Sequence, residues 1–207
     1  MTEEEIDFYA KELMYAIKAK KMTYTPELIF EEGPVTDDTF YEESLNFGLQ
    51  QMSKVEADVY EKYQKQPFGP YRMVYKEGMG YDVVADKDIP AAMLVCEYVG
   101  EVVSYRRVIK LEAENGHNDS LFELSVGRNA DETLYIRPEK FTNLGRFVNG
   151  VNNETGKKKI NIGSVKLFYN GKPGIFLYTI RSIKKGESLA YDYNAGELNA
   201  YNTSDFL

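Results

Sequence analysis

Hydrophobic residues near the start of the chain recur every three or four positions, which predicts an amphipathic helix over residues 2–20. Thr2 and Glu5 have the spacing of a capping box, in which each side chain bonds to the backbone amide of the other residue. The apolar face is expected to consist of Ile6, Tyr9, Ala10, Leu13, Met14 and Ile17. The chain is therefore predicted to begin with a helix that has one apolar and one polar face.

A second helix is predicted where Ser53 and Glu56 form another capping box, and Pro67 marks its end. Its apolar side is expected to consist of Val55, Val59, Tyr60 and Tyr63. The stretch between the two helices, residues 22–48, is interrupted by prolines and glycines and is expected to be an irregular connection.

After Gly69 the pattern changes to short apolar runs separated by turn residues, which predicts a series of short strands. The segment YNGKPG between two of these runs is a hairpin signal. One more helix is expected from Ser104 to Ala113, because the dipeptide NG follows as a stop signal. The pattern therefore predicts a helical front followed by a mostly β body.

Composition narrows the class of protein. The 207 residues are 43% hydrophobic, which suits one domain with a sizeable core, and no apolar run is long enough to span a membrane. The single cysteine, Cys96, cannot form an intramolecular disulfide, which fits a reducing compartment such as the cytosol or nucleus. The single histidine, His117, lies in a polar, turn-like stretch, so neither a zinc cluster nor histidine-based catalysis is expected.

The net charge of −8 argues against a nucleic-acid-binding platform, since such surfaces are usually basic. An acidic surface can instead steer a basic partner, such as a lysine-rich peptide tail, toward the protein. The same charge could serve solubility alone, so net charge does not distinguish a surface that attracts a basic partner from one that only keeps the protein in solution.

Three stretches carry candidate chemistry, although each has a common structural explanation. Gly78 and Gly80 in EGMGYDVVA would allow a ligand to approach the backbone closely, but a simple hairpin turn uses the same residues. The amide side chains of NLGRFVNGVNN suit the edge of an adenine ring, but asparagine-rich turns are common. Tyr191 and Tyr193 in KKGESLAYDYN share one face of an extended segment, where tyrosines usually only pack.

Taken together and in this order, the motifs resemble those of the SET-domain protein lysine methyltransferases. That family carries a glycine-x-glycine turn, EYxGE, RFxN and GEELxYDY, which stand here as GMG, EYVGE, RFVN and GESLAYDY. The variant NGVNN, the lysine run KKK and the ending YDYN…Y.T..F make the chain most similar to the trithorax-related histone H3 lysine-27 monomethyltransferases of plants and ciliates. The resemblance extends over residues 22–207 and is looser before residue 68.

The resemblance implies a mainly β fold, the SET-domain β-clip of short sheets with a pseudoknot, after an α-helical N-terminal segment. The expected divisions are the N-terminal segment at residues 1–68, the SET domain at 69–194 and a C-terminal tail at 195–207. Many relatives hold a zinc-bound flap after YDY, but this chain has no cysteines there and no metal is expected. The tail, with Phe206, is therefore expected to close the lysine channel.

The activity that the resemblance implies is methyl transfer from S-adenosylmethionine to a lysine amine, with S-adenosylhomocysteine as the product. Direct displacement requires the sulfur, the methyl carbon and the amine nitrogen in line, with the nitrogen about 3 Å from the carbon. The lysine must be neutral, and both desolvation and the positive sulfonium would lower its pKa. A strong general base is then not required, which is consistent with a chain that has one histidine.

The resemblance also implies roles for individual residues. Tyr193 would align the methyl transfer, and Tyr98 would line the lysine channel. Tyr191 stands where phenylalanine would leave room for added methyl groups, so monomethylation is expected. The expected cofactor contacts are Met79, Gly80, Tyr81, Arg146, Phe147, Asn149, Gly150 and Tyr193, and the expected substrate contacts are Tyr98, Tyr191 and Phe206.

Two of the cofactor contacts carry a further expectation. The Asn149 amide is the expected main polar contact to the cofactor. Gly150 replaces the family's usual histidine, which costs cofactor affinity only if that histidine acts through its ring rather than its backbone.

The implied substrate is a basic histone H3 tail, added as an extended peptide to a strand edge by a nuclear, monomeric enzyme with no membrane or nucleic-acid partner. Three alternatives stay open. The protein could methylate a non-histone protein, could be a catalytically silent SET-fold module that binds peptides, or could be an all-β structural protein with accidental motif matches. The intact Tyr193, Tyr98 and GMG argue against the silent module.

Overall fold

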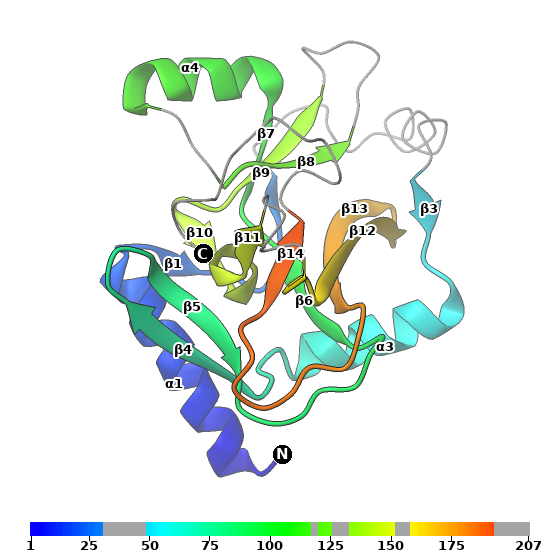
Figure 1. The fold of residues 1–207 in the computed structure, drawn as a ribbon. Coiled ribbons are helices and arrows are strands. Elements are labelled where there is room, and N and C mark those ends of the chain that lie inside the picture. The colour runs from blue at the N-terminus through cyan, green and yellow to red at the C-terminus, as the bar shows by residue number, and fades with distance from the viewer. Residues whose placement is uncertain (31–48, 117–119, 126–132, 152–157, 193–207) are drawn as a thin grey trace.

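Residues in short strands outnumber helical residues in the part of the chain that the structure describes. A computed structural model describes residues 1–30, 49–116, 120–125, 133–151 and 158–192. The described residues form a six-stranded sheet, a four-stranded sheet and two two-stranded sheets, with helices α1, α3 and α4 around them (Figure 1). The predicted mainly β fold with a helical N-terminal segment is therefore confirmed.

The first helix, α1 (Glu3–Ala19), forms where the hydrophobic pattern predicts it. Both halves of its capping box are present, since Thr2 and Glu5 each bond to the backbone amide of the other residue. The buried face consists of Tyr9, Leu13, Ala16 and Ile17. This face packs beside the β4 (Tyr71–Lys76) and β5 (Gly80–Ala85) hairpin, and Figure 1 shows the two elements side by side.

The second helix, α3 (Lys54–Lys65), begins after the capping box of Ser53 with Glu56, as predicted. The expected apolar side is partly wrong: Val55 is 72% exposed and Val59 is 43% exposed, whereas Tyr60 is buried. Each step along a helix turns the side chain by about 100°, so Val59 and Tyr60 point in different directions. The tyrosines, and not the valines, attach this helix to the body.

The third helix, α4 (Tyr105–Asn115), also forms close to its predicted range. The Ser104 hydroxyl caps its first turn by accepting from the backbone amide of Arg107, and Gly116 ends it with a φ of 88°. A φ in this range favours glycine, which is the reason that the dipeptide NG is a stop signal.

The six-stranded sheet contains residues of three of the motifs that the sequence singles out, EYVGE in β6, RFVN in β11 and YDY in β14. Its order is β11–β14–β12–β13–β6, and β3 pairs with β12 at the side. The hairpin between β12 and β13 turns at Asn170 and Gly171, which both have positive φ, as a two-residue turn of this kind requires. The strands are β3 (Gln50–Gln51), β6 (Leu94–Tyr98), β11 (Asn149–Val151), β12 (Ile162–Tyr169), β13 (Lys172–Thr179) and β14 (Ala190–Asp192).

Strand β14 lies between β11 and β12, and both pairings are parallel. In this register Tyr191 is the partner of Gly150 on one side and of Ile162 on the other. The end of the described chain therefore inserts between two earlier strands, which brings the YDY and RFVN motifs together.

The remaining strands form the smaller sheets. Besides the β4–β5 hairpin, a two-stranded parallel sheet and a four-stranded sheet of order β2–β7–β9–β8 are present among the described residues. Their strands are β1 (Thr23–Tyr24), β10 (Phe141–Thr142), β2 (Ile29–Phe30), β7 (Glu101–Ser104), β8 (Phe122–Ser125) and β9 (Leu134–Arg137). Within the described ranges, no helix has both the length and the apolar character that crossing a membrane requires.

Candidate functional site

Four separated motifs meet at one place in the structure. The backbone amide of Leu189, from GESLAYDY, donates to the Val83 carbonyl of β5 over 2.8 Å. The amide of Asn149, from RFVN, donates to the Leu189 carbonyl over 3.3 Å. The strand that carries the glycine turn, the RFVN segment and β14 are therefore immediate neighbours.

The fourth motif, EYVGE, is joined to this group through the 3₁₀ turn η2 (Leu144–Phe147). The Asn143 side chain donates to the Glu97 carbonyl over 2.7 Å and accepts from the Gly145 amide over 2.9 Å. A Cβ atom on Gly145 would lie only 3.0 Å from Cδ2 of Tyr98, so glycine allows this close packing. Asn143 was not among the predicted site residues, although it stands three residues before Arg146 of the RFVN motif.

An aromatic wall is formed by Tyr98, Phe122 and Tyr191. The Tyr98 ring meets the Phe122 ring edge to face at 5.2 Å between centroids, and Phe122 stacks on Tyr191 at 6.0 Å. Tyr98 and Tyr191 are buried, and the Tyr98 hydroxyl donates to the Ser120 carbonyl over 2.6 Å. The structure thus brings together two of the predicted substrate residues.

Phe122 is part of this wall but was not predicted from the sequence. Its strand, read as LFELSV, alternates so that Phe122 and Leu124 face the same side. That alternation predicts a buried face, but pairing with a distant tyrosine on β14 depends on the tertiary fold. The run alone could not reveal it.

The predicted cofactor residues Tyr81 and Phe147 are also in contact. Their rings meet edge to face at 6.1 Å, and Tyr75 packs against Tyr81 at 5.4 Å. Gly150 lies in the neighbouring strand β11, paired with Tyr191.

The glycine turn itself is a hairpin turn, with Met79 between two glycines of positive φ, 81° at Gly78 and 88° at Gly80. A Cβ atom at Gly78 would meet nothing within 4 Å, and one at Gly80 would approach only Lys20, with Nζ at 3.7 Å. The interpretation of this motif as a hairpin turn is therefore correct. The turn is also open enough on this side for a ligand to approach its backbone.

Arg146 has a buried side-chain hydrogen-bond donor, Nε, that lacks an acceptor among the described residues. A buried N–H without an acceptor is costly, so an acceptor from a ligand or from elsewhere in the chain is expected to satisfy it. The role of Arg146 in a cofactor site stays a prediction.

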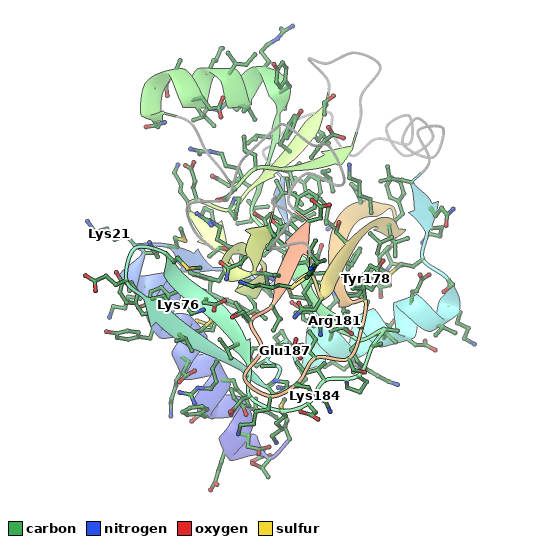
Figure 2. All side chains as sticks on the ribbon, in the orientation of Figure 1. Lys21, Lys76, Tyr178, Arg181, Lys184 and Glu187 are labelled. Atoms are coloured by element: carbon green, nitrogen blue, oxygen red, sulfur yellow. The ribbon has the colours of Figure 1, made fainter. Side chains whose placement is uncertain are left out.

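Asn149, the predicted main polar contact, is held from within the protein. Its Nδ2 donates to Oδ1 of Asp82 over 2.5 Å. Asp82 also accepts from the Ser188 hydroxyl over 2.6 Å and forms an ion pair with Lys76 over 2.5 Å, and Figure 2 labels Lys76 on the β4–β5 hairpin. Asp82 was not predicted from the sequence, although an acidic residue inside the apolar strand GYDVVA is an unusual signal.

Glu187 of the GESL segment has a structural role. Its carboxylate accepts from Arg181 Nη2 over 2.8 Å and from the Lys184 backbone amide over 2.7 Å, and Figure 2 labels these three residues together. The hydrogen bond from Arg181 is the main reason that the pKa of Glu187 is lowered. Glu187 therefore fixes the turn that leads into β14.

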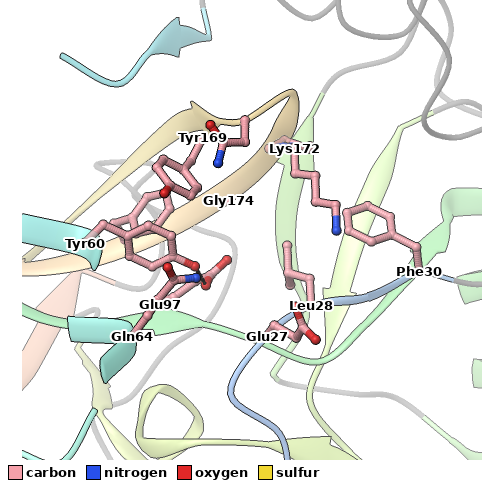
Figure 3. Close-up of a pocket in the computed structure, with 12 residues that line it drawn as sticks. Glu27, Leu28, Phe30, Tyr60, Gln64, Glu97, Tyr169, Lys172 and Gly174 are labelled. Carbon is pink, nitrogen blue, oxygen red and sulfur yellow. Dashed lines mark hydrogen bonds between the residues drawn. The ribbon is translucent and has the colours of Figure 1, made fainter. Parts of the chain in front are cut away.

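A separate pocket lies on the other side of β6, because neighbouring strand residues point to opposite faces. Glu97 lines it, next to Tyr98 in the chain, and accepts a hydrogen bond from Tyr60 (Figure 3). Desolvation raises the pKa of Glu97 to about 7, and the nearby Glu27 carboxylate adds to this shift, whereas Lys172 opposes it. The pocket has a volume of about 180 Å³ and is distinct from the aromatic wall.

Two predicted site residues, Tyr193 and Phe206, lie outside the described residues, as does His117. Within the described ranges, no group of three or more histidine, cysteine, aspartate or glutamate side chains could hold a metal ion. The single cysteine, Cys96, is buried, and burial raises the pKa of its thiol.

Comparison with known proteins places this arrangement in a family. A sequence profile of the SET domain matches residues 80–194. Histone-lysine N-methyltransferase ATXR5 of Arabidopsis thaliana is 31% identical over 201 residues, which cover 94% of this chain and 52% of that protein. The probable histone-lysine N-methyltransferase ATXR5 of Ricinus communis is 30% identical with the same coverage. The chain thus spans about half the length of these curated relatives.

A solved structure agrees with the sequence comparison. The crystal structure of ATXR5 in complex with histone H3.1 mono-methylated on arginine 26 is similar with a TM-score of 0.83 and 28% identity. The similarity covers 99% of this chain and 95% of that one, and the profile match covers more than half of the chain. The chain therefore belongs to the SET-domain family.

Proposed function

We propose that the protein is an S-adenosylmethionine-dependent protein-lysine N-methyltransferase that places one methyl group on lysine 27 of histone H3. The observation that carries this proposal is the aromatic wall of Tyr98, Phe122 and Tyr191, in which Tyr191 pairs with Gly150 just after the RFVN segment and follows Leu189, which bonds to Val83 of the strand after the glycine turn. Family membership and the similarity to ATXR5 support it.

The aromatic wall suits a lysine side chain. The rings give the aliphatic stem an apolar surface, and ring faces attract an ammonium group. A channel without water also lowers the pKa of the bound lysine, because desolvation disfavours the charged form. Binding in this channel would therefore help to produce the neutral amine that attacks the methyl group.

The residues beside this wall fit the cofactor. The open glycine turn offers backbone groups, Arg146 offers a buried Nε–H, and Asn149 offers its side-chain carbonyl oxygen. Tyr81 and Phe147 offer ring surface that meets edge to face, and Gly150 lies in β11 as the partner of Tyr191. Met79, in the glycine turn directly before β5, belongs to the same proposed cofactor site. When bound, S-adenosylmethionine supplies a methyl group on a positively charged sulfur, which the lysine nitrogen attacks directly.

Asn149 can bond to a ligand through fewer of its side-chain atoms than an unpaired amide group could. A free amide offers both donors and acceptors, but here Nδ2 faces Asp82. Asn149 would therefore receive a hydrogen bond from an N–H group of the cofactor through Oδ1. The proposed role of Tyr193, aligning the transfer, rests on the family resemblance.

The proposed partner is a histone H3 tail. A basic peptide complements the net charge of −8, and the similar ATXR5 was crystallised in complex with histone H3.1. We further propose that the protein acts in the nucleus as a monomer. The divisions at residues 1–68, 69–194 and 195–207, with Phe206 in a tail that closes the channel, are part of the same proposal.

The experiment is a panel of histone H3 peptides incubated with the protein and S-adenosylmethionine, with products read by mass spectrometry. The proposal expects one added methyl group on lysine 27 and none on a peptide in which that lysine is replaced by arginine. Activity on another protein, with no H3 product, would favour a non-histone methyltransferase. No calorimetric binding of S-adenosylhomocysteine would favour a silent peptide-binding module.

A further inference from the structure

Asp82 is a fully buried carboxylate in strand β5, with 0% of its surface exposed. Its neighbours in the strand, Tyr81 and Val83, belong to the apolar core or pack against it. A buried carboxylate is costly unless it is paired and hydrogen-bonded, so its partners must offset its desolvation. Any effect of Asp82 on a ligand site would pass through these partners.

Those partners come from three different segments. Lys76 Nζ lies 2.5 Å from the carboxylate and belongs to β4, Asn149 Nδ2 lies 2.5 Å away and belongs to β11, and Ser188 Oγ lies 2.6 Å away, two residues before β14. The backbones of these segments are also joined, since Leu189 bonds to Val83 and Asn149 bonds to Leu189. Asp82 therefore adds a side-chain link between the glycine-turn strand and the RFVN segment.

A carboxylate has a property here that no amide or hydroxyl side chain would have. It only accepts hydrogen bonds, so the Asn149 amide must present Nδ2 to it. The orientation of an asparagine amide is otherwise set by whichever partners surround it. Because Nδ2 donates to Asp82, Oδ1 is the atom through which the Asn149 amide can accept a hydrogen bond from a ligand.

We propose that Asp82 is a positioning residue for cofactor binding, which holds the Asn149 amide in the orientation that presents its carbonyl oxygen. This inference rests on the proposed function, because it takes S-adenosylmethionine as the ligand. An asparagine or serine at position 82 can donate to Asn149 and so permits the amide to turn over. The acceptor-only character of Asp82 is therefore what this role requires.

The test is the variant Asp82→Asn, which keeps the size of the side chain. Calorimetry with S-adenosylhomocysteine should show binding weakened about tenfold, as expected for a displaced hydrogen bond to a charged or polar group. Steady-state kinetics should show the same increase in KM for S-adenosylmethionine while kcat stays within about twofold, because the residue does not touch the reacting atoms.

Glu12→Gln is the matched control. Glu12 is also a carboxylate with several donors, since it accepts from Arg72 Nε over 2.7 Å and from the Met73 backbone amide over 3.1 Å. These bonds tie α1 to β4, whereas those of Asp82 tie β5 to the RFVN segment. The control variant should lose stability and leave the dissociation constant of S-adenosylhomocysteine unchanged.

A double-mutant cycle gives the second readout. If Asp82 acts through Asn149, then adding Asp82→Asn to Asn149→Ala should weaken S-adenosylhomocysteine binding no further. If Asp82→Asn does not fold, as judged by circular dichroism, Asp82→Ser replaces it, since serine can also donate to Asn149.

The outcomes separate this inference from the proposed function. Wild-type protein that does not bind S-adenosylhomocysteine would overturn the proposed function. Wild-type binding that Asp82→Asn leaves unchanged, or an effect that persists at full size in the Asn149→Ala background, would overturn the positioning role alone.

Discussion

Two buried carboxylates, Asp82 and Glu97, stand in different surroundings. Asp82 has a cationic partner, Lys76, and two neutral donors, Asn149 and Ser188. Glu97 accepts from the hydroxyl of Tyr60 and has a second carboxylate nearby, and its pKa is raised to about 7. The two carboxylates therefore differ in their partners: those of Asp82 come from three segments around the candidate site, whereas desolvation, to which the Glu27 carboxylate adds, raises the pKa of Glu97.

The largest expected effect is the loss of stability in Asp82→Ala. Removing this carboxylate leaves the Asn149 amide and the Ser188 hydroxyl without their buried acceptor. The free energy of unfolding should fall by about 3 kcal/mol, the low end for a broken buried pair, because Lys76 is partly exposed and can reach water. Urea unfolding measures this change, and a loss below about 0.5 kcal/mol would show that Asp82 links nothing of importance.

A pH-dependent effect is expected from Glu97→Gln. The pKa of Glu97 is raised from 4.5 to about 7 in the folded protein, so the folded state binds the proton more tightly than the unfolded state. The stability that this proton contributes is present below pH 4.5 and is lost as pH rises through about 7. Glutamine removes this dependence and keeps an acceptor for Tyr60.

The wild type should therefore lose stability relative to Glu97→Gln between about pH 5 and pH 8, on the order of 2 kcal/mol. Thermal unfolding across this pH range is the measurement. Parallel stability curves for the two proteins would mean that Glu97 does not titrate in this window.

A smaller effect is expected from Tyr60→Phe. The variant removes the hydroxyl that donates to Glu97 but keeps the ring that packs against Phe176 and Tyr169. The free energy of unfolding should fall by about 1 kcal/mol, and more at about pH 8 than at about pH 5, because the ionised carboxylate needs the donor more. Chemical denaturation at both pH values tests this, and an equal loss at both would contradict it.

The smallest effect is expected from Val59→Ser, one residue before Tyr60. Val59 is 43% exposed and lies on the solvent side of α3, so the change should stay within about 0.5 kcal/mol. A loss above about 1 kcal/mol in the same denaturation assay would restore the sequence-based prediction that Val59 packs against the body.

Local signals in the sequence predicted much of the fold. The capping boxes of α1 and α3, the cap of α4 and the turn at Asn170 and Gly171 depend on residues close in the chain, and all are confirmed. The apolar side of α3 was partly wrong, because the choice between Val59 and Tyr60 depends on which face meets the sheet.

The site could be predicted only in part, for a similar reason. The ordered motifs led to the family and to Tyr98 and Tyr191, which the structure brings to one aromatic wall. Phe122 and Asp82 were missed because Tyr191, Asn149 and Ser188 are distant from them in sequence and meet them only in the folded protein, where β14 lies beside β11. No local pattern records such pairings.

Tyr191→Phe tests the central claim, that the wall of Tyr98, Phe122 and Tyr191 is a lysine channel in which the Tyr191 hydroxyl limits methylation. The measurement is the mass distribution of a histone H3 peptide after complete reaction with wild type and with the variant. We expect monomethyl-lysine alone from the wild type and dimethyl- and trimethyl-lysine from Tyr191→Phe, since losing the hydroxyl leaves room for added methyl groups. Monomethyl-lysine alone from both proteins, or an unmodified peptide from both, would contradict the claim.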